Sequence, residues 1–248
     1  MTRVILGIAL LALTAASAAA ADLAARNLPA RPASVAAPLF TGFYMGLAGG
    51  GQWQRDRMIE TLTCPCGNEY TLSGSTSSLG AFGAGFAGYS LQFNSLVLGI
   101  EADLSAGNVN HKDSFPQTAP DSFGSRLLWD ASIRARLGYA INRVLLYVTG
   151  GVAFGEIRHR YDRYDLNGGN GAYDFVAAQN FTHNRTGWTL GAGVEYAFAP
   201  GWTTRVEYRY TDFGTTTDHP TLYAPPQMFT ERHREEFHSQ RVGVAYRF

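Results

Sequence analysis

The chain has little charge, almost no lysine and almost no cysteine. Charged residues make up 16% of its 248 residues, and 20 basic residues balance 20 acidic ones, so the formal net charge at pH 7 is zero. There is therefore no electrostatic case for a nucleic-acid partner. The two cysteines cannot supply a disulfide framework, and without a second pair they do not make a zinc site.

The sequence also lacks a hydrophobic run long enough for a membrane-spanning helix. Its most apolar stretch, residues 4–13, is about ten residues long, whereas a spanning helix needs about twenty. A basic residue precedes this stretch and a tail of small residues follows it, which is the layout of a signal peptide. The sequence therefore predicts a signal peptide over residues 1–21, cleaved after Ala20 or Ala21, and export from the cytoplasm.

Residues 22–40 are rich in alanine and proline and follow no structural period, which predicts a flexible periplasmic linker. From residue 41 onward, about eight segments alternate large apolar residues with small or polar ones, the pattern of strands with two different faces. A helix is not favoured, because glycines lie inside every segment and the apolar residues do not recur at helical spacing. If this part of the chain enters a membrane, it must do so as strands. We predict an all-β barrel domain over residues 41–248.

Alternation is clearest over residues 126–140, where Trp129 and Ile133 share one face and Asp130 and Arg134 the other. Ionisable residues recur at the middle of such polar faces, with acids and arginines in nearly equal numbers: Glu101, Asp103, Asp130, Glu195 and Glu207 against Arg134, Arg136, Arg205, Arg209, Arg241 and Arg247. Opposite charges can pair across a narrow lumen. A solvated sheet face would be expected to carry lysines, and Lys112 is the only lysine in the chain. We expect the polar faces to line a transmembrane barrel; the alternative is a soluble, lipocalin-like barrel with its apolar face inside.

Aromatic residues on the apolar faces sort into two levels. One level holds Trp53, Trp129 and Trp188, and the other holds Phe43, Tyr139, Tyr196, Trp202 and Tyr246. Two aromatic belts separated by aliphatic residues match the two interfaces of a bilayer. The connections between the predicted strands alternate in length. They are short near residues 94–95, 142–143 and 199–201, and long over residues 54–78, 105–125, 156–183 and 213–238. This predicts short periplasmic turns and four long extracellular loops.

Several blocks, in order, resemble one family. FTGFYMGLAGG (40–50), SIRARLGYA (132–140), RTGWTLGAGVEYAF (185–198) and RVGVAYRF (241–248) resemble the small outer-membrane β-barrel proteins of alphaproteobacteria, called porin-family, outer-membrane immunogenic or hemin-binding surface proteins. The resemblance implies an eight-stranded antiparallel up-and-down barrel, like the transmembrane part of OmpA, in the cell outer membrane. A barrel there contacts outer-membrane lipid. The charged run of residues 231–236 is most simply a solvated loop, and contact with anionic lipopolysaccharide is the alternative. Phe248 is similar to the C-terminal aromatic residue that the barrel-assembly machinery recognises.

Eight strands enclose just enough space for side chains, so we expect no wide pore. The expected function is that of a surface protein in envelope integrity, surface antigenicity or adhesion, with no catalytic residue, metal site or cofactor identified. The alternative is that the loops bind a host factor, haem or another small ligand. Haem iron or a metal would be held by histidines in or beside the loops: His111, His159, His183, His219, His233 and His238. A further alternative, a lipid-modifying enzyme, depends on His238 and Ser239, but neighbours on a strand point to opposite faces.

Two other motifs leave alternatives open. Cys64 and Cys66 lie in the first long loop, where an oxidising compartment favours a disulfide and two-residue spacing strains it; a bound metal is the lesser alternative. Residues 83–88 match G-x-G-x-x-G, but within a strand, so the match is not a dinucleotide fingerprint. We expect lumen glycines there to leave room for the arginines.

The class prediction is tested by refolding the chain in detergent. We expect a β-type far-UV circular dichroism spectrum and a gel mobility that changes on boiling. A chain that is soluble without detergent would mean that the two faces are inverted.

Overall fold

The computed structural model describes residues 39–63, 69–110, 113–114, 122–166, 173–219 and 228–248. The expected signal peptide and nearly all of the expected linker lie outside the described residues, as do Cys64, Cys66 and His111. No helix within the described ranges is long and apolar enough to cross a membrane.

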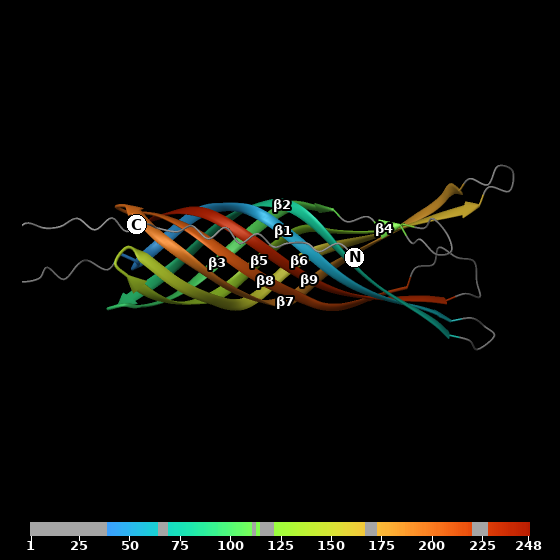
Figure 1. Ribbon diagram of the computed structural model, residues 1–248, viewed down its shortest axis with the longest axis horizontal. Helices are drawn as coiled ribbons and strands as arrows, with labels where there is room; N and C mark the ends of the chain where they lie inside the picture. Colours follow the sequence, from blue (N-terminus) through green and yellow to red (C-terminus); the bar gives the residue numbers. More distant parts are fainter. Residues whose placement is uncertain (1–38, 64–68, 111–112, 115–121, 167–172, 220–227) are drawn as a thin grey trace, which may run out of the picture. The chain divides into compact units, whose positions relative to one another are not determined.

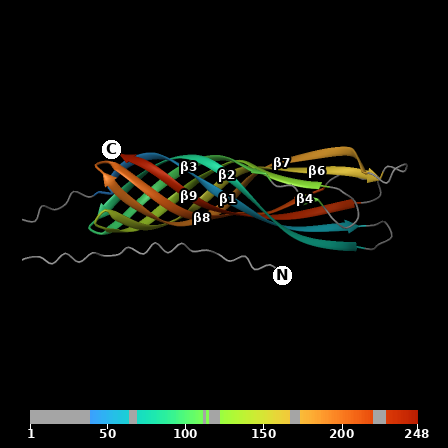
Figure 2. The same ribbon diagram turned by 45° about the horizontal axis from the view of Figure 1, so that its top comes forward.

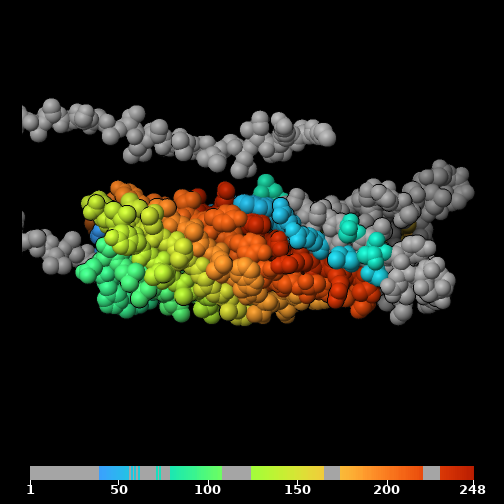
Figure 3. Space-filling view, turned by 60° about the horizontal axis from the view of Figure 1, so that its bottom comes forward, coloured from blue at the N-terminus to red at the C-terminus, as the bar shows by residue number. Residues whose placement is uncertain are grey.

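Eight long antiparallel strands close into a barrel (Figure 1). The strands are β1 (Gly42–Thr63), β2 (Glu69–Phe93), β3 (Leu96–Asn110), β4 (Asp113–Ser114), β5 (Ser122–Ile141), β6 (Val144–Leu166), β7 (Tyr173–Ala199), β8 (Trp202–Asp218) and β9 (Met228–Arg247). Each long strand pairs with the next, β3 with β5, and the short β4 adds one pairing beside β5. β1 pairs with β9 and closes the ring; Figure 3 shows the blue band of β1 beside the red band of β9. The prediction of an eight-stranded up-and-down barrel is confirmed, with β4 as an unexpected addition.

Short turns connect the strands at one end of the barrel. Asn94, Asn142 and Gly201 have φ angles of 54°, 53° and 74° in these turns. Glycine adopts this left-handed region without cost, and asparagine tolerates it better than most residues. The short connections lie where the sequence predicts them.

At the other end the structure corrects the expected loop lengths. β1 and β2 stay paired as far as Thr63 and Glu69, and β6 and β7 stay paired as far as Leu166 and Tyr173. Most of the expected loops are therefore strand, and Figure 2 shows β6 and β7 continuing beyond the rest of the barrel. We call this part of the barrel, beyond the aromatic level of Trp53 and Trp188, the extension. Most of its outward positions are polar, for example Arg158, Arg160, Arg232 and Arg234, and Ile59, Phe175 and Val176 are exceptions. Apolar alternation therefore stops where the outer face leaves lipid for water.

Between the two ends, the outer surface is apolar. Leu47 is 74% exposed, Ile100 57% and Val206 58%. All eight predicted belt aromatics lie at this surface: Phe43, Trp53, Trp129, Tyr139, Trp188, Tyr196, Trp202 and Tyr246. An exposed apolar belt of this kind is stable against acyl chains and not against water. The lipocalin-like alternative, which requires this face to be buried, is wrong.

Phe40 closes the short-turn end from inside. This residue, the last of the expected linker, is fully buried. Ser90 Oγ and Arg247 Nη1 donate hydrogen bonds to its carbonyl oxygen at 2.6 and 3.0 Å. The residues buried with it form an apolar cluster: Val97, Ala140, Leu145, Tyr147 and Ala197.

Replacing Phe40 with alanine is expected to lower the free energy of unfolding by about 3–5 kcal/mol, because it leaves a cavity in this cluster. Urea unfolding of vesicle-inserted protein, followed by tryptophan fluorescence, measures the change. Leu39→Ala is the matched control, because Leu39 is 45% exposed. Equal effects of the two substitutions would argue against a closing role for Phe40.

Candidate functional site

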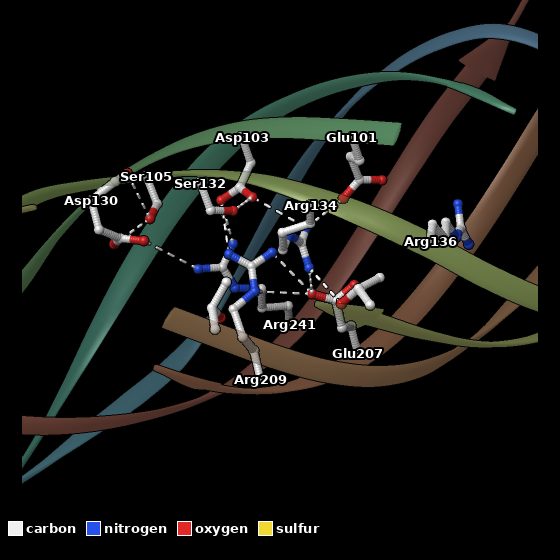
Figure 4. A network of polar contacts seen from close by, with 12 residues as sticks. Glu101, Asp103, Ser105, Asp130, Ser132, Arg134, Arg136, Glu207, Arg209 and Arg241 are labelled. Carbon is white, nitrogen blue, oxygen red and sulfur yellow. Dashed lines mark hydrogen bonds and ion pairs between the residues drawn. The ribbon is translucent and has the colours of Figure 1, made fainter. Parts of the chain in front are cut away.

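The interior of the barrel at the level of the apolar belt is filled by charged side chains (Figure 4). They come from β3, β5, β7, β8 and β9, whose alternate residues point inward. All eleven predicted lumen residues are at most 9% exposed: Glu101, Asp103, Asp130, Arg134, Arg136, Glu195, Arg205, Glu207, Arg209, Arg241 and Arg247. We call this set the lumen network.

Arg134 lies at the centre of the lumen network (Figure 4). Its Nη2 donates to Glu101 Oε1 and lies 3.1 Å from Asp103 Oδ2. Its Nη1 donates to Glu207 Oε1 at 2.9 Å. Glu101 and Asp103 are on β3 and Glu207 is on β8, and these two strands are not neighbours, so the contacts cross the lumen.

Other arginines also contact carboxylates inside the lumen. Arg209 and Arg241 donate to the same oxygen of Asp103, at 2.8 and 3.1 Å. Arg205 donates to both carboxylate oxygens of Glu101. Glu195 accepts from Arg136 and also lies 3.5 Å from Arg247. The side chains of Arg134, Glu101 and Glu207 are 0% exposed, so water does not reach them at this level.

Aromatic groups that were not predicted from the sequence also line the lumen. Tyr44 donates to Glu101 at 2.9 Å and Tyr147 to Glu207 at 3.0 Å. The guanidinium carbons of Arg136 and Arg205 lie 3.8 and 3.5 Å from the ring centres of Tyr147 and Phe86, in cation–π geometry. The inward position of Tyr44 could have been predicted from alternation, because Phe43 and Met45 on either side of it face outward.

The expectation about the glycines of residues 83–88 needs correction. Gly83 and Gly85 are exposed on the outer face. Gly88 faces inward, where a Cβ atom would lie 2.6 Å from the hydroxyl of Tyr44. The inward glycine therefore leaves room for a tyrosine, and the outward glycines leave no room for arginines.

A second buried polar group lies in the extension. His159 Nδ1 is 2.6 Å from Asp218 Oδ2, and its Nε2 is 2.9 Å from Glu235 Oε1. Burial alone would lower the pKa of His159, but hydrogen bonds with Asp218 and Glu235 outweigh it and raise this pKa to about 9. Burial alone would raise the pKa of Asp218, but the hydrogen bond and charge of His159 lower it to about 2. His159 is therefore positively charged at neutral pH.

The structure brings some of the predicted histidines together and separates the others. His183 lies 5.7 Å and His233 4.9 Å from His159, ring centre to ring centre. His238 instead stacks on Trp53 at the outer face, and His219 is exposed. The expectation of histidines scattered in loops is wrong for His159 and His233, which are 0% exposed inside the barrel extension.

His238 and Ser239 do not form a catalytic pair. His238 accepts or donates a hydrogen bond with Tyr208 on the outer side, at 2.7 Å. Ser239 is 3% exposed and accepts a hydrogen bond from Arg241 inside the lumen. The two side chains therefore lie on opposite faces of β9.

Arg134→Leu is expected to lower the free energy of unfolding by about 3–5 kcal/mol, because it leaves buried carboxylates without their partner. Arg160→Leu is the control: Arg160 is half exposed and pairs with Asp162 on the surface, so its loss is expected to cost less than about 1 kcal/mol. Urea unfolding from vesicles compares the two variants. An unchanged stability of Arg134→Leu would count against an inward, paired Arg134.

Known proteins support this architecture. Residues 8–248 match the family model of the outer membrane protein beta-barrel domain. The 31 kDa outer-membrane immunogenic protein of Brucella melitensis is 32% identical over 244 residues, which cover 96% of each chain. The 22 kDa outer membrane protein of Rhizobium leguminosarum is 32% identical over 199 residues, 76% of this chain and 70% of that protein.

A solved structure shares the fold. The outer membrane protein OprG of Pseudomonas aeruginosa superimposes with a TM-score of 0.55 at 11% identity, over 84% of this chain and 96% of that one. With the closed ring of eight long strands and the exposed apolar belt, the sequence matches place this protein in the outer membrane. The chain belongs to the family of outer-membrane β-barrel proteins that includes the outer-membrane immunogenic proteins of Brucella.

Proposed function

We propose that this protein is a closed surface barrel that contributes to envelope integrity and displays its extension outside the cell as an antigen or adhesin. The observation that carries the proposal is the lumen network, whose central side chains are 0% exposed. A barrel filled in this way does not act as a wide pore. Two relatives are named outer-membrane immunogenic proteins, which supports display of the loop end.

Contacts with lipid and with the assembly machinery belong to the same proposal. Exposed arginines on the outer side of the extension, such as Arg158 and Arg232, suit the phosphates of lipopolysaccharide. Phe248 is 68% exposed, and its ring lies 5.8 Å from Phe43 and 5.0 Å from Tyr246. We assign it the role of the C-terminal assembly signal. Haem capture has no comparable support, because His159 and His233 are fully buried.

Planar-bilayer recordings test whether the lumen is closed. The wild-type protein is expected to give no lasting channel steps. The double variant Arg205→Ala, Arg209→Ala shortens two side chains that cross the lumen, so it is expected to leak small ions. A general porin is the positive control, and gel mobility before and after boiling checks that each variant is folded.

Antibody labelling of intact cells tests the display of the extension in the same study. Antibodies against the refolded protein are expected to label cells that produce it, and not a deletion strain. Porin-sized steps from the wild-type protein would overturn the closed-barrel proposal. Absence of label on intact producing cells would overturn the proposed surface display.

A further inference from the structure

The buried polar group in the extension has the composition of a metal site. His159 on β6, Asp218 on β8 and His233 on β9 each offer a ligand atom, and these atoms all lie within 4.8 Å of one another. The three residues are 0%, 2% and 0% exposed. Glu231 adds a carboxylate oxygen 3.3 Å from His233 Nε2. We call these four residues the histidine–carboxylate cluster.

The ligand atoms are close enough together to surround one small ion. Zinc binds histidine nitrogen and carboxylate oxygen at about 2.0–2.2 Å, so neighbouring ligands of a tetrahedral site are about 3.3–3.5 Å apart. The ligand atoms of His159, Asp218 and His233 lie within 4.8 Å of one another, and Glu231 lies 3.3 Å from His233 Nε2. The Tyr161 hydroxyl lies 2.9 Å from Asp218 Oδ2 and 3.1 Å from His233 Nε2, so it has to turn aside when an ion binds between them.

A β-bulge places Asp218 in the cluster. One extra residue enters β8 between Asp212 and Thr215, where Gly214 has a φ angle of 74°. Before the bulge the inward residues of β8 are odd-numbered, as in Arg209, and beyond it they are even-numbered, as in Asp218. Bulges often re-aim a side chain next to a functional site. Without this bulge, the carboxylate would face away from His159.

Buried negative charge around the cluster exceeds the positive charge that faces it, and a bound cation would reduce this excess. Three carboxylates, those of Asp218, Glu231 and Glu235, are buried together. Among the described residues, their ionic partners are histidines only, whereas Glu101 and Asp103 in the lumen each contact several arginines. Glu235 Oε2 is buried and has no hydrogen-bond partner in the described part of the chain. Buried negative charge without full compensation is unfavourable.

We propose that His159, Asp218, His233 and Glu231 bind one divalent transition-metal ion of the zinc type. Imidazole nitrogen selects such ions over Ca²⁺ and Mg²⁺, which prefer oxygen ligands alone. A histidine binds the ion through a deprotonated ring nitrogen, so a proton on that nitrogen is released to water.

Two further residues orient the ligands. Glu235 Oε1 is 2.9 Å from His159 Nε2, and His183 Nε2 is 2.7 Å from Asp218 Oδ1. Contacts of this kind fix the orientation of metal ligands. The bound ion links β6, β8 and β9, and thereby stiffens the part of the barrel that extends beyond the lipid belt. This inference is independent of the closed lumen.

Calorimetric titration of the purified, tag-free protein in detergent with zinc chloride tests the proposal. We expect one Zn²⁺ per chain, and at least a tenfold weaker affinity in His159→Gln and in His233→Gln. His238→Gln is the matched control, because His238 lies on the same strand as His233 but at the outer face. It is expected to bind Zn²⁺ as the wild type does. Excess Ca²⁺ is expected not to displace the zinc.

A second measurement uses the wild-type protein only, so it does not depend on the folding of any variant. Co²⁺ is expected to give the visible absorption of a tetrahedral nitrogen–oxygen site, and Zn²⁺ is expected to abolish it and to raise the thermal midpoint. The absence of saturable Zn²⁺ binding by the wild type overturns the proposal. Equal affinities in folded His233→Gln and His238→Gln, or displacement by Ca²⁺, also overturn it.

Discussion

Pairing charges inside a narrow, lipid-surrounded lumen is the constraint on which the rest of the barrel depends. Every inward carboxylate at this level needs an arginine within reach, so the register between strands has to be held. Glu101 lies directly opposite Arg134 in the pairing of β3 with β5, and Glu207 opposite Arg241 in that of β8 with β9. A slip of one residue would turn these charges toward lipid and the apolar belt toward the lumen. The lumen network therefore specifies register as well as filling space.

The two ends of the lumen are built from different chemistry, because they meet different surroundings. At the short-turn end, Phe40 and an apolar cluster close the barrel below the arginines. In the extension, histidines take the place that arginines hold in the lumen network. Arginine keeps its charge at any accessible pH, whereas histidine exchanges protons and binds metals. The permanent charge of arginine suits the lumen network inside the lipid-surrounded part of the barrel. Histidine, whose charge can change, suits the extension beyond the lipid.

Much of the barrel could be predicted from the sequence, because lipid and lumen impose opposite demands on neighbouring residues. Because of that contrast, the two faces of residues 126–140 could be assigned from the sequence. All eleven lumen residues face inward, as alternation predicts. The transverse contacts, such as that between Asp103 and Arg241, depend on how the ring closes, so no local pattern contains them. The extension was mistaken for loops because its outer face is mostly polar. Alternation detects a strand only where its two faces meet different solvents.

The histidine–carboxylate cluster was missed for a further physical reason. Glu231, His233 and Glu235 follow one another at a spacing of two, which places them on one face of a strand, and this signal was present in the sequence. Asp218 gave no such signal, because the bulge at Gly214 reverses the inward phase of β8 just before it. One inserted residue in β8 therefore decides whether Asp218 faces the histidines or the outer surface. The β-bulge at Gly214 therefore brings Asp218 into the cluster and also makes its inward position unpredictable from alternation.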